Sequence, residues 1–263
     1  MNNLRKIGLS ALAGSLATFS VNAAEMSVSG AASISFDDTN RGFGDRGNSF
    51  YMGDSIKFNA SGETDGGIGV AVYYEWDGQI LDDHKITLSG DFGSLVFDGH
   101  GGSSAFGAID DKTPNAYEEA WDIIDTNGST SGGTPTVING VSANNMFIYT
   151  TPDMGGATLT ASYINGGGSD AAPEGSTSFA VKLSPEAMDG LTIGAGISNN
   201  TTAESVDTDE TTAYLTYATG GITVGVQSSD LDITTAGSDQ ESMAYGITYA
   251  VNDDMSIGYS YHE

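Results

Sequence analysis

The feature that most constrains this chain is a repeated alternation between apolar and small polar side chains. In the first run, Met26, Val28 and Ile34 share one face, while most intervening residues are serine. A period of two places alternate side chains on opposite faces of a β-strand. The chain contains about 13 such runs, so the sequence predicts an all-β fold. The other apolar faces are Ile56, Phe58, Ala60; Ile68, Val70, Val72, Tyr74, Trp76; Ile86, Leu88; Leu95, Phe97; Ala157, Leu159, Ala161, Tyr163; Phe179, Val181, Leu183; Leu191, Ile193, Ala195, Ile197; Ala213, Leu215, Tyr217; Ile222, Val224, Val226; Met243, Tyr245, Ile247, Tyr249, Val251; Met255, Ile257, Tyr259, Tyr261; and the stretch 146–151, whose facing stays open.

Charge is kept off one face of these strands. With 146–151 set aside, no apolar-face position holds a charged residue, although the chain has 35 acidic and 8 basic side chains. A soluble sandwich would also alternate, but its apolar face would be inside and would need a core of bulky side chains. Here the other face is mostly Ser, Thr, Gly, Ala and Asn, small polar groups suited to water. An apolar outside, a polar inside and aromatic rims are typical of a transmembrane antiparallel up-and-down β-barrel. The aromatic residues near strand ends are Phe36, Trp76, Tyr163, Tyr217, Tyr249, Tyr259 and Tyr261.

The connections between the predicted strands alternate in length. Barrels of the bacterial outer membrane have short periplasmic turns and long external loops. The short connections carry the Gly, Asn, Asp and Pro residues that tight turns need, and an N-terminus in the periplasm places every longer connection outside. The longer connections are 37–49, 78–83, 99–145, 165–175, 198–210 and 228–240, and the short ones are 64–67, 90–93, 152–156, 185–190, 219–221 and 252–254.

Composition excludes several classes of protein. The chain has no Cys, which excludes disulfides and thiolate metal sites. A formal charge of −27 opposes binding to nucleic acid. No stretch of about 18 apolar residues follows the N-terminal segment, which excludes helical membrane spans. His84, His100 and His262 lack metal-ligand spacing, and no catalytic or phosphate-binding motif is present, so we predict neither an enzyme nor a cofactor protein.

The N-terminal segment predicts export. Arg5 and Lys6 precede an apolar run of small residues that ends at Val21, Asn22 and Ala23, the pattern of a secretory signal. We therefore expect a signal peptide at 1–23 and a barrel at 24–263. A membrane anchor is the alternative, but the run is short and interrupted by polar residues.

Several segments carry a family resemblance when they are taken together and in order. They are the strand 26–30, the turn 63–68, the Ser-Gly-Asp-Phe-Gly-Ser-Leu segment 89–95, and the segments 149–152 and 156–163 around another turn. In this arrangement the chain, from about residue 24 to its end, resembles the general diffusion porins of Gram-negative bacteria, especially the alphaproteobacterial type. The resemblance implies a homotrimer of 16-stranded barrels in the outer membrane, with the third external loop folded into the lumen. It also implies passive diffusion of small hydrophilic solutes and ions.

The C-terminal residues depart from this family pattern. Such porins are expected to end on an aromatic residue, usually Phe, whereas this sequence ends Tyr261-His262-Glu263. Thirteen is also an odd number of strands, and an unpaired edge is unfavourable in lipid. We therefore expect a chain that lacks about three C-terminal strands; a smaller barrel that closes here is the alternative.

The long connection 99–145 is the expected functional segment. Within it, 113–125 predicts a short helix, with Thr113 as N-cap and Pro114 in the first turn. By the resemblance this segment is the pore constriction, with acidic groups facing a basic wall, and the excess of carboxylates predicts a preference for cations. The acidic candidates are Asp110, Asp111, Glu118, Glu119, Asp122 and Asp125, and the basic candidates are Arg41, Arg46, Lys57, Lys85 and Lys182.

Other readings stay open. A substrate-specific channel fits the same pattern, while a secreted acidic β-rich adhesin would need an internal repeat that is not visible. A barrel enzyme would need a catalytic group at the rim. External loops with Asp209, Glu210, Asp230 and Asp232 could bind divalent cations such as Ca²⁺ weakly through oxygen ligands.

Overall fold

One antiparallel sheet makes up most of the protein. The computed structural model describes residues 25–37, 49–78, 80–116, 138–165, 175–201, 207–234, 239–253 and 255–263. Its main sheet has 13 strands, and each strand pairs with its neighbours along the chain. These strands are β1 (Glu25–Asp37), β2 (Ser49–Glu63), β3 (Gly69–Asp77), β4 (Ile80–Gly90), β5 (Gly93–His100), β8 (Met146–Thr150), β9 (Ala157–Ile164), β10 (Gly175–Leu183), β11 (Leu191–Thr201), β12 (Asp207–Thr219), β13 (Ile222–Ile233), β14 (Gln240–Asn252) and β15 (Met255–His262).

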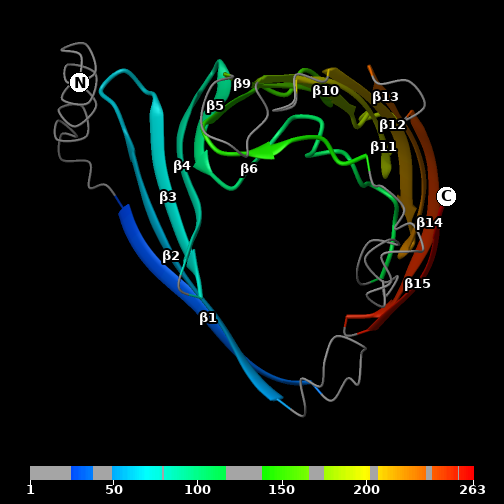
Figure 1. The fold of residues 1–263 in the computed structure, drawn as a ribbon, viewed down its shortest axis with the longest axis horizontal. Coiled ribbons are helices and arrows are strands. Elements are labelled where there is room, and N and C mark those ends of the chain that lie inside the picture. Colours follow the sequence, from blue (N-terminus) through cyan, green and yellow to red (C-terminus); the bar gives the residue numbers. More distant parts are fainter. Residues whose placement is uncertain are drawn as a thin grey trace.

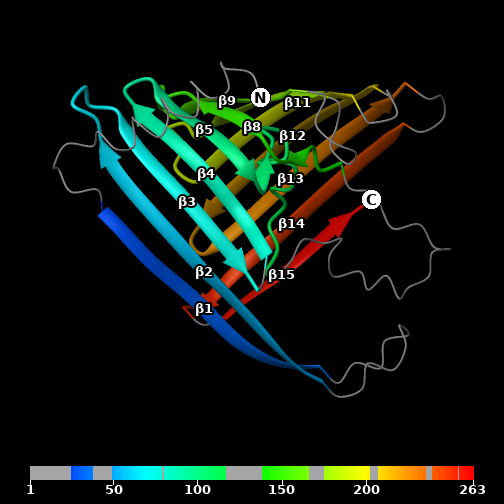
Figure 2. The same cartoon turned by 60° about the vertical axis from the view of Figure 1, so that its left-hand side comes forward.

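The sheet curves around an interior space, which we call the lumen (Figure 1). The strands run up and down in sequence order, as the alternation predicts, and they are tilted relative to one another (Figure 2). β1 and β15 are the two edges of the sheet among the described strands. A second ladder of two short strands, β6 (Gly102–Ser103) and β7 (Ser142–Ala143), lies in the connection between β5 and β8.

The exposure of the side chains is inverted relative to a soluble protein. On β10, Ser178 is 0% exposed whereas its neighbour Phe179 is 43% exposed. On β11, Ser198 is 3% exposed and Ile197 is 56% exposed. The apolar row therefore covers the outside of the sheet, and the small polar row faces the lumen. A face of this kind is stable against hydrocarbon and unfavourable in water.

Aromatic side chains lie on the outer face near both ends of the strands. Trp76, Tyr163, Tyr217 and Tyr259 are all at least 36% exposed, as the sequence predicts. The stretch 146–151, whose facing the sequence left open, follows the same rule. Phe147 is exposed and packs on Phe97 of β5 with ring centroids 4.9 Å apart, while Met146 is fully buried on the lumen side. Among the described residues, no helix has the length and apolar character needed to cross a membrane.

The connections after β1, β5 and β9 are longer than any at the other end of the sheet, whereas those after β3, β11 and β13 are not. We call the end that carries the connections after β1, β5, β9, β11 and β13 the long-loop end, and the other the short-turn end. Three predicted connections are corrected. The one after β3 comprises residues 78 and 79 rather than 78–83, the one after β11 comprises 202–206 rather than 198–210, and the one after β13 comprises 234–239 rather than 228–240. Ile80–Asp83 belong to β4, and a bulge after Glu75 shifts the register between β3 and β4. The extra residue of a bulge hides such pairing from a strict period of two.

Candidate pore constriction

The connection between β5 and β8 comprises residues 101–145, and its described residues lie within the lumen (Figure 1). We call it the inner loop; the structure describes its two parts, 101–116 and 138–145. The β6–β7 ladder joins the two parts near the wall. Thr113–Ala116 form no helical turn, which contradicts the predicted helix start, and the rest of that helix lies outside the described residues.

Serine side chains of the wall hold the first part of the inner loop. The backbone N–H of Ala105 donates to Ser162 Oγ on β9 over 3.0 Å, and that of Phe106 donates to Ser178 Oγ on β10 over 3.2 Å. The two serine hydroxyls are themselves 2.6 Å apart. Phe106 is fully buried in this contact. The small polar face of the sheet thus supplies acceptors to a loop backbone that would otherwise be buried without partners.

Gln227 on β13 holds the next part of the loop. Its amide nitrogen donates to the carbonyl oxygens of Ile109 (2.9 Å) and Asp110 (2.7 Å) and to Thr212 Oγ1 on β12 (2.8 Å). Its amide oxygen accepts the backbone N–H of Lys112 over 2.7 Å. Gln227 is 4% exposed. One side chain therefore satisfies three backbone groups of the loop and fixes its distance from the wall.

Glycines on the last strands make room for the following residues. A Cβ on Gly225 of β13 would lie 2.6 Å from Pro114 Cδ, and one on Gly246 of β14 would overlap the carbonyl oxygen of Pro114. On β15, a Cβ on Gly258 would lie 3.0 Å from the backbone nitrogen of Ala116. These glycines allow the loop to cross close to the sheet.

The structure places two of the predicted acidic residues against the neighbouring wall. Asp110 and Asp111 are half-buried and line a small cavity with residues of β13–β15, among them Ser229 and His262. Asp110 Oδ1 accepts the N–H of Asp111 (2.7 Å), and Asp111 Oδ1 accepts the N–H of Thr113 (2.8 Å). These local turn bonds aim the carboxylates at the wall beside them rather than across the lumen. Glu118, Glu119, Asp122 and Asp125 lie outside the described residues.

Burial raises the pKa of both carboxyls. Desolvation is the largest effect on Asp110 and raises its pKa to about 6, against the opposing hydrogen bond from Asp111 N–H and the charge of Lys112. Desolvation also raises the pKa of Asp111. Asp110 is therefore close to its titration point near neutral pH.

Two of the predicted basic residues lie on β2 and β4, where each has an acidic partner. Lys57 Nζ is 3.0 Å from Glu75 Oε1, and the hydroxyl of Tyr73 donates to the same carboxylate. Lys85 Nζ is 3.9 Å from Asp83 Oδ2 and lies over the Tyr73 ring. This part of the wall therefore carries both acidic and basic side chains. Arg41 and Arg46 lie outside the described residues.

The alternation already placed Glu75 on the lumen face, so that residue could have been found from the sequence. The same holds for Asp98, which follows the apolar-face residue Phe97 and pairs with Lys85 in the regular register of β4 and β5. Asp98 is 4% exposed.

The four residues named for divalent cations do not converge. Glu210 faces the lumen and accepts a 3.0 Å bond from Asn200 Nδ2. Asp209 pairs with Asp232, and Asp230 pairs with Thr211, on the opposite face of β12 and β13. Within the described ranges, the acidic and histidine side chains close enough to share an ion are instead those of Glu75, Asp82 and Asp83.

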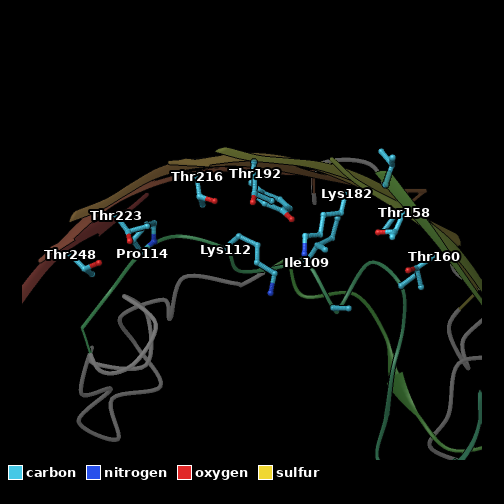
Figure 3. A pocket seen from close by; sticks show the side chains of 15 residues that line it. Ile109, Lys112, Pro114, Thr158, Thr160, Lys182, Thr192, Thr216, Thr223 and Thr248 are labelled. Atoms are coloured by element: carbon cyan, nitrogen blue, oxygen red, sulfur yellow. The ribbon is translucent and has the colours of Figure 1, made fainter. Parts of the chain in front are cut away.

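Lys182, the fifth predicted basic residue, lines a cavity of about 590 Å³ between the inner loop and the wall. The ammonium-bearing residue on the opposite side of this cavity is Lys112 of the loop, which the sequence did not single out (Figure 3). Threonines of five strands cover the wall between them: Thr158, Thr160, Thr192, Thr216, Thr223 and Thr248. All lie toward the short-turn end of their strands.

Solved structures of porins share this architecture. An anion-selective porin from Comamonas acidovorans is 17% identical and matches with a TM-score of 0.57, over 90% of this chain and 78% of that one. A loop-deletion mutant of OmpT from Vibrio cholerae is 14% identical with a TM-score of 0.61, over 90% and 82%. Salmonella typhi OmpF in complex with daunomycin is 11% identical with a TM-score of 0.58, over 91% and 79%. At these identities the likeness concerns the fold. A search of curated protein sequences finds no significant match.

The family follows from a match between the sequence and a family profile. The profile of the family described as Gram-negative porin matches residues 8–263, nearly the whole chain. An up-and-down sheet with an apolar outer face and a loop laid along its inner wall is the architecture that this family uses for outer-membrane channels. The chain belongs to the Gram-negative porin family.

Proposed function

We propose that this porin carries small hydrophilic solutes and ions across the outer membrane by passive diffusion and prefers cations. The inverted exposure of neighbouring side chains, as at Ser178 and Phe179, is the observation that supports a water-filled path inside an apolar surface. The inner loop narrows that path because its backbone is tied to the wall by Ser162, Ser178 and Gln227. A pore narrowed in this way selects solutes by size and charge.

The charges of the protein support the preference for cations. The formal charge is −27. At the long-loop end the lumen carries Glu75, Asp83, Asp98 and Glu210, whereas Lys57 and Lys85 are paired with two of these carboxylates. An excess of one sign of charge in a cleft raises the local concentration of counter-ions, and here four carboxylates outnumber two ammonium groups. Cations are therefore enriched at this mouth of the pore.

Export and assembly complete the proposal. Residues 1–23 act as the signal peptide, so that the protein crosses the inner membrane before it inserts in the outer one. The protein assembles as a homotrimer, in which part of the exposed apolar face contacts the neighbouring subunits. Chemical cross-linking of the folded protein in detergent should give bands of three subunits; cross-linking that never exceeds one subunit would contradict the trimer.

Planar bilayers test the channel and its preference separately. The purified, folded protein should give stepwise ohmic conductance in KCl. In a tenfold KCl gradient, the zero-current potential should be positive on the dilute side because K⁺ crosses more readily than Cl⁻. A protein that is folded and inserted but gives no conductance would contradict the channel. A potential of the opposite sign would contradict only the preference for cations.

A further inference from the structure

The cavity beneath the inner loop has the opposite electrical character to the rest of the chain. Lys112 and Lys182 line it, and none of the described residues that line it carries a carboxylate. The chain as a whole has 35 acidic and only 8 basic side chains. A cavity that gathers two of the basic side chains without an acidic one is therefore a local exception.

The two lysines come from independent parts of the structure. Lys182 is on the lumen face of β10, two residues after Ala180, which the loop buries. Lys112 is on the inner loop, where its backbone N–H is fixed by Gln227 Oε1 at 2.7 Å. Both side chains are exposed. In Figure 3 Lys182 extends from the wall toward the loop, whereas Lys112 extends from the loop with its ammonium group directed away from the wall.

The carboxylates nearest to Lys112 in the sequence are directed elsewhere. Asp110 and Asp111 accept hydrogen bonds from backbone N–H groups and line the separate small cavity beside His262. Their charges act on Lys112 at a distance, since Lys112 lowers the pKa of both. The ion pairs of Lys57 and Lys85 both lie outside the cavity.

The rest of the lining is uncharged, and about half of it supplies hydrogen-bond donors while the other half is apolar. Six threonines from β9, β11, β12, β13 and β14 line the wall, and Tyr214 adds a phenol ring. A hydroxyl can donate to an anion while its oxygen accepts from a neighbour. Two ammonium groups in a cavity whose wall also offers hydroxyl donors suit an oxyanion, because charge-assisted hydrogen bonds to oxyanions are strong. A hydrated cation would meet two like charges there.

We propose that this cavity is a binding site for small oxyanions with two negative charges, of which inorganic phosphate is the simplest. The proposal rests on the proposed function in one respect: the site binds permeating anions only if the lumen conducts. Carboxylates at the long-loop end and ammonium groups at the short-turn end then give the pore opposite local charges along its length.

Binding of inorganic phosphate to the folded protein in neutral detergent tests the site without requiring conductance. Isothermal titration at low ionic strength should show saturable binding to wild type that weakens as salt is added. Lys112→Gln and Lys182→Gln should each lower the affinity about tenfold, since one charged hydrogen bond contributes about 1.5 kcal/mol. The double variant should show no binding. Lys85→Gln, which removes an ammonium group outside the cavity, is the matched control and should bind as wild type does.

A second measurement needs only the wild-type protein. Phosphate should slow acetylation of Lys112 and Lys182 relative to Lys85, as read by mass spectrometry of peptides. Wild type without saturable binding, or a folded double variant that still binds, would overturn the site. Equal loss in the Lys85→Gln control would do the same. Conductance without phosphate binding would leave the channel standing and reject the site, whereas binding without conductance would reject the channel alone.

Discussion

The side-chain amide of Gln227 fixes the position of the inner loop in the pore. It joins the wall to the inner loop through four hydrogen bonds, three of them to loop backbone groups. Gln227→Met keeps the side-chain volume but leaves these buried groups without a partner. This should destabilise the attachment of the inner loop to the wall by about 3 kcal/mol. Hydrogen exchange measured by mass spectrometry should show lost protection at 109–113. Gln240→Met, at the start of β14, is the control, and unchanged protection in Gln227→Met would contradict the assignment.

Asp110 makes the attachment of the inner loop to the wall sensitive to pH. Its pKa is raised from 3.8 to about 6, so its contribution to stability is complete below about pH 4 and is lost as the pH rises through about 6. After correction for intrinsic exchange rates, the inner loop should be better protected at pH 5 than at pH 8. Asp110→Asn should reduce this difference, leaving the part due to Asp111, while Asp91→Asn in an exposed turn should not. A difference that Asp110→Asn leaves untouched would contradict this role.

The path of the inner loop depends on the strands that it crosses as much as on its own sequence. Gly246→Ala would place a Cβ on the carbonyl oxygen of Pro114, and neither a strand nor a prolyl carbonyl can move far. We expect the loop to be displaced into the lumen, with changed single-channel conductance and lower stability by about 1–3 kcal/mol. Gly66→Ala is the matched control, because its Cβ would meet only Thr64 Oγ1 at 3.9 Å. Equal conductance of the two variants would contradict the close crossing.

The strands could be predicted from the sequence and the loop contacts could not, for a physical reason. Alternation is a local property, so Ile193 and Ile197 reveal their common face without knowledge of any partner strand. The connections after β3, β11 and β13 are shorter than the sequence predicts. The one after β3 lies beside a bulge that breaks the alternation, and the end of β11, Ser198–Thr201, is polar on both faces, so no apolar row marks it as a strand. The loop contacts join residues far apart in the chain, such as Ala105 to Ser162 and Ile109 to Gln227, 118 positions apart. A serine on the lumen face looks the same in the sequence whether it meets water or a loop.

The same limit explains the charged residues of the pore. Period two places Lys57 and Lys85 on the lumen face, but their pairing with Glu75 and Asp83 follows from strand register. Lys112 could not be predicted as a pore residue, because a loop has no side-chain periodicity that shows which way a residue faces. Its place opposite Lys182 is visible only after the inner loop has been set against the wall.

In the molecule as a whole, the channel depends on which face of the sheet meets water. The protein has no Cys, so single cysteines can report on that face without a background. Adjacent positions on β12 and β13 provide matched pairs: Leu215 and Val224 belong to the apolar outer row, whereas Thr216 and Thr223 line the cavity in the lumen.

The most direct measurement is therefore the labelling of these four positions by a small, charged, water-soluble thiol reagent in protein reconstituted into lipid vesicles. Thr216→Cys and Thr223→Cys should react readily, and Leu215→Cys and Val224→Cys should react only after the protein is unfolded. Rapid labelling of Leu215→Cys and Val224→Cys with protection of the two threonine positions would show that the apolar row faces water, and the channel would then have no structural basis.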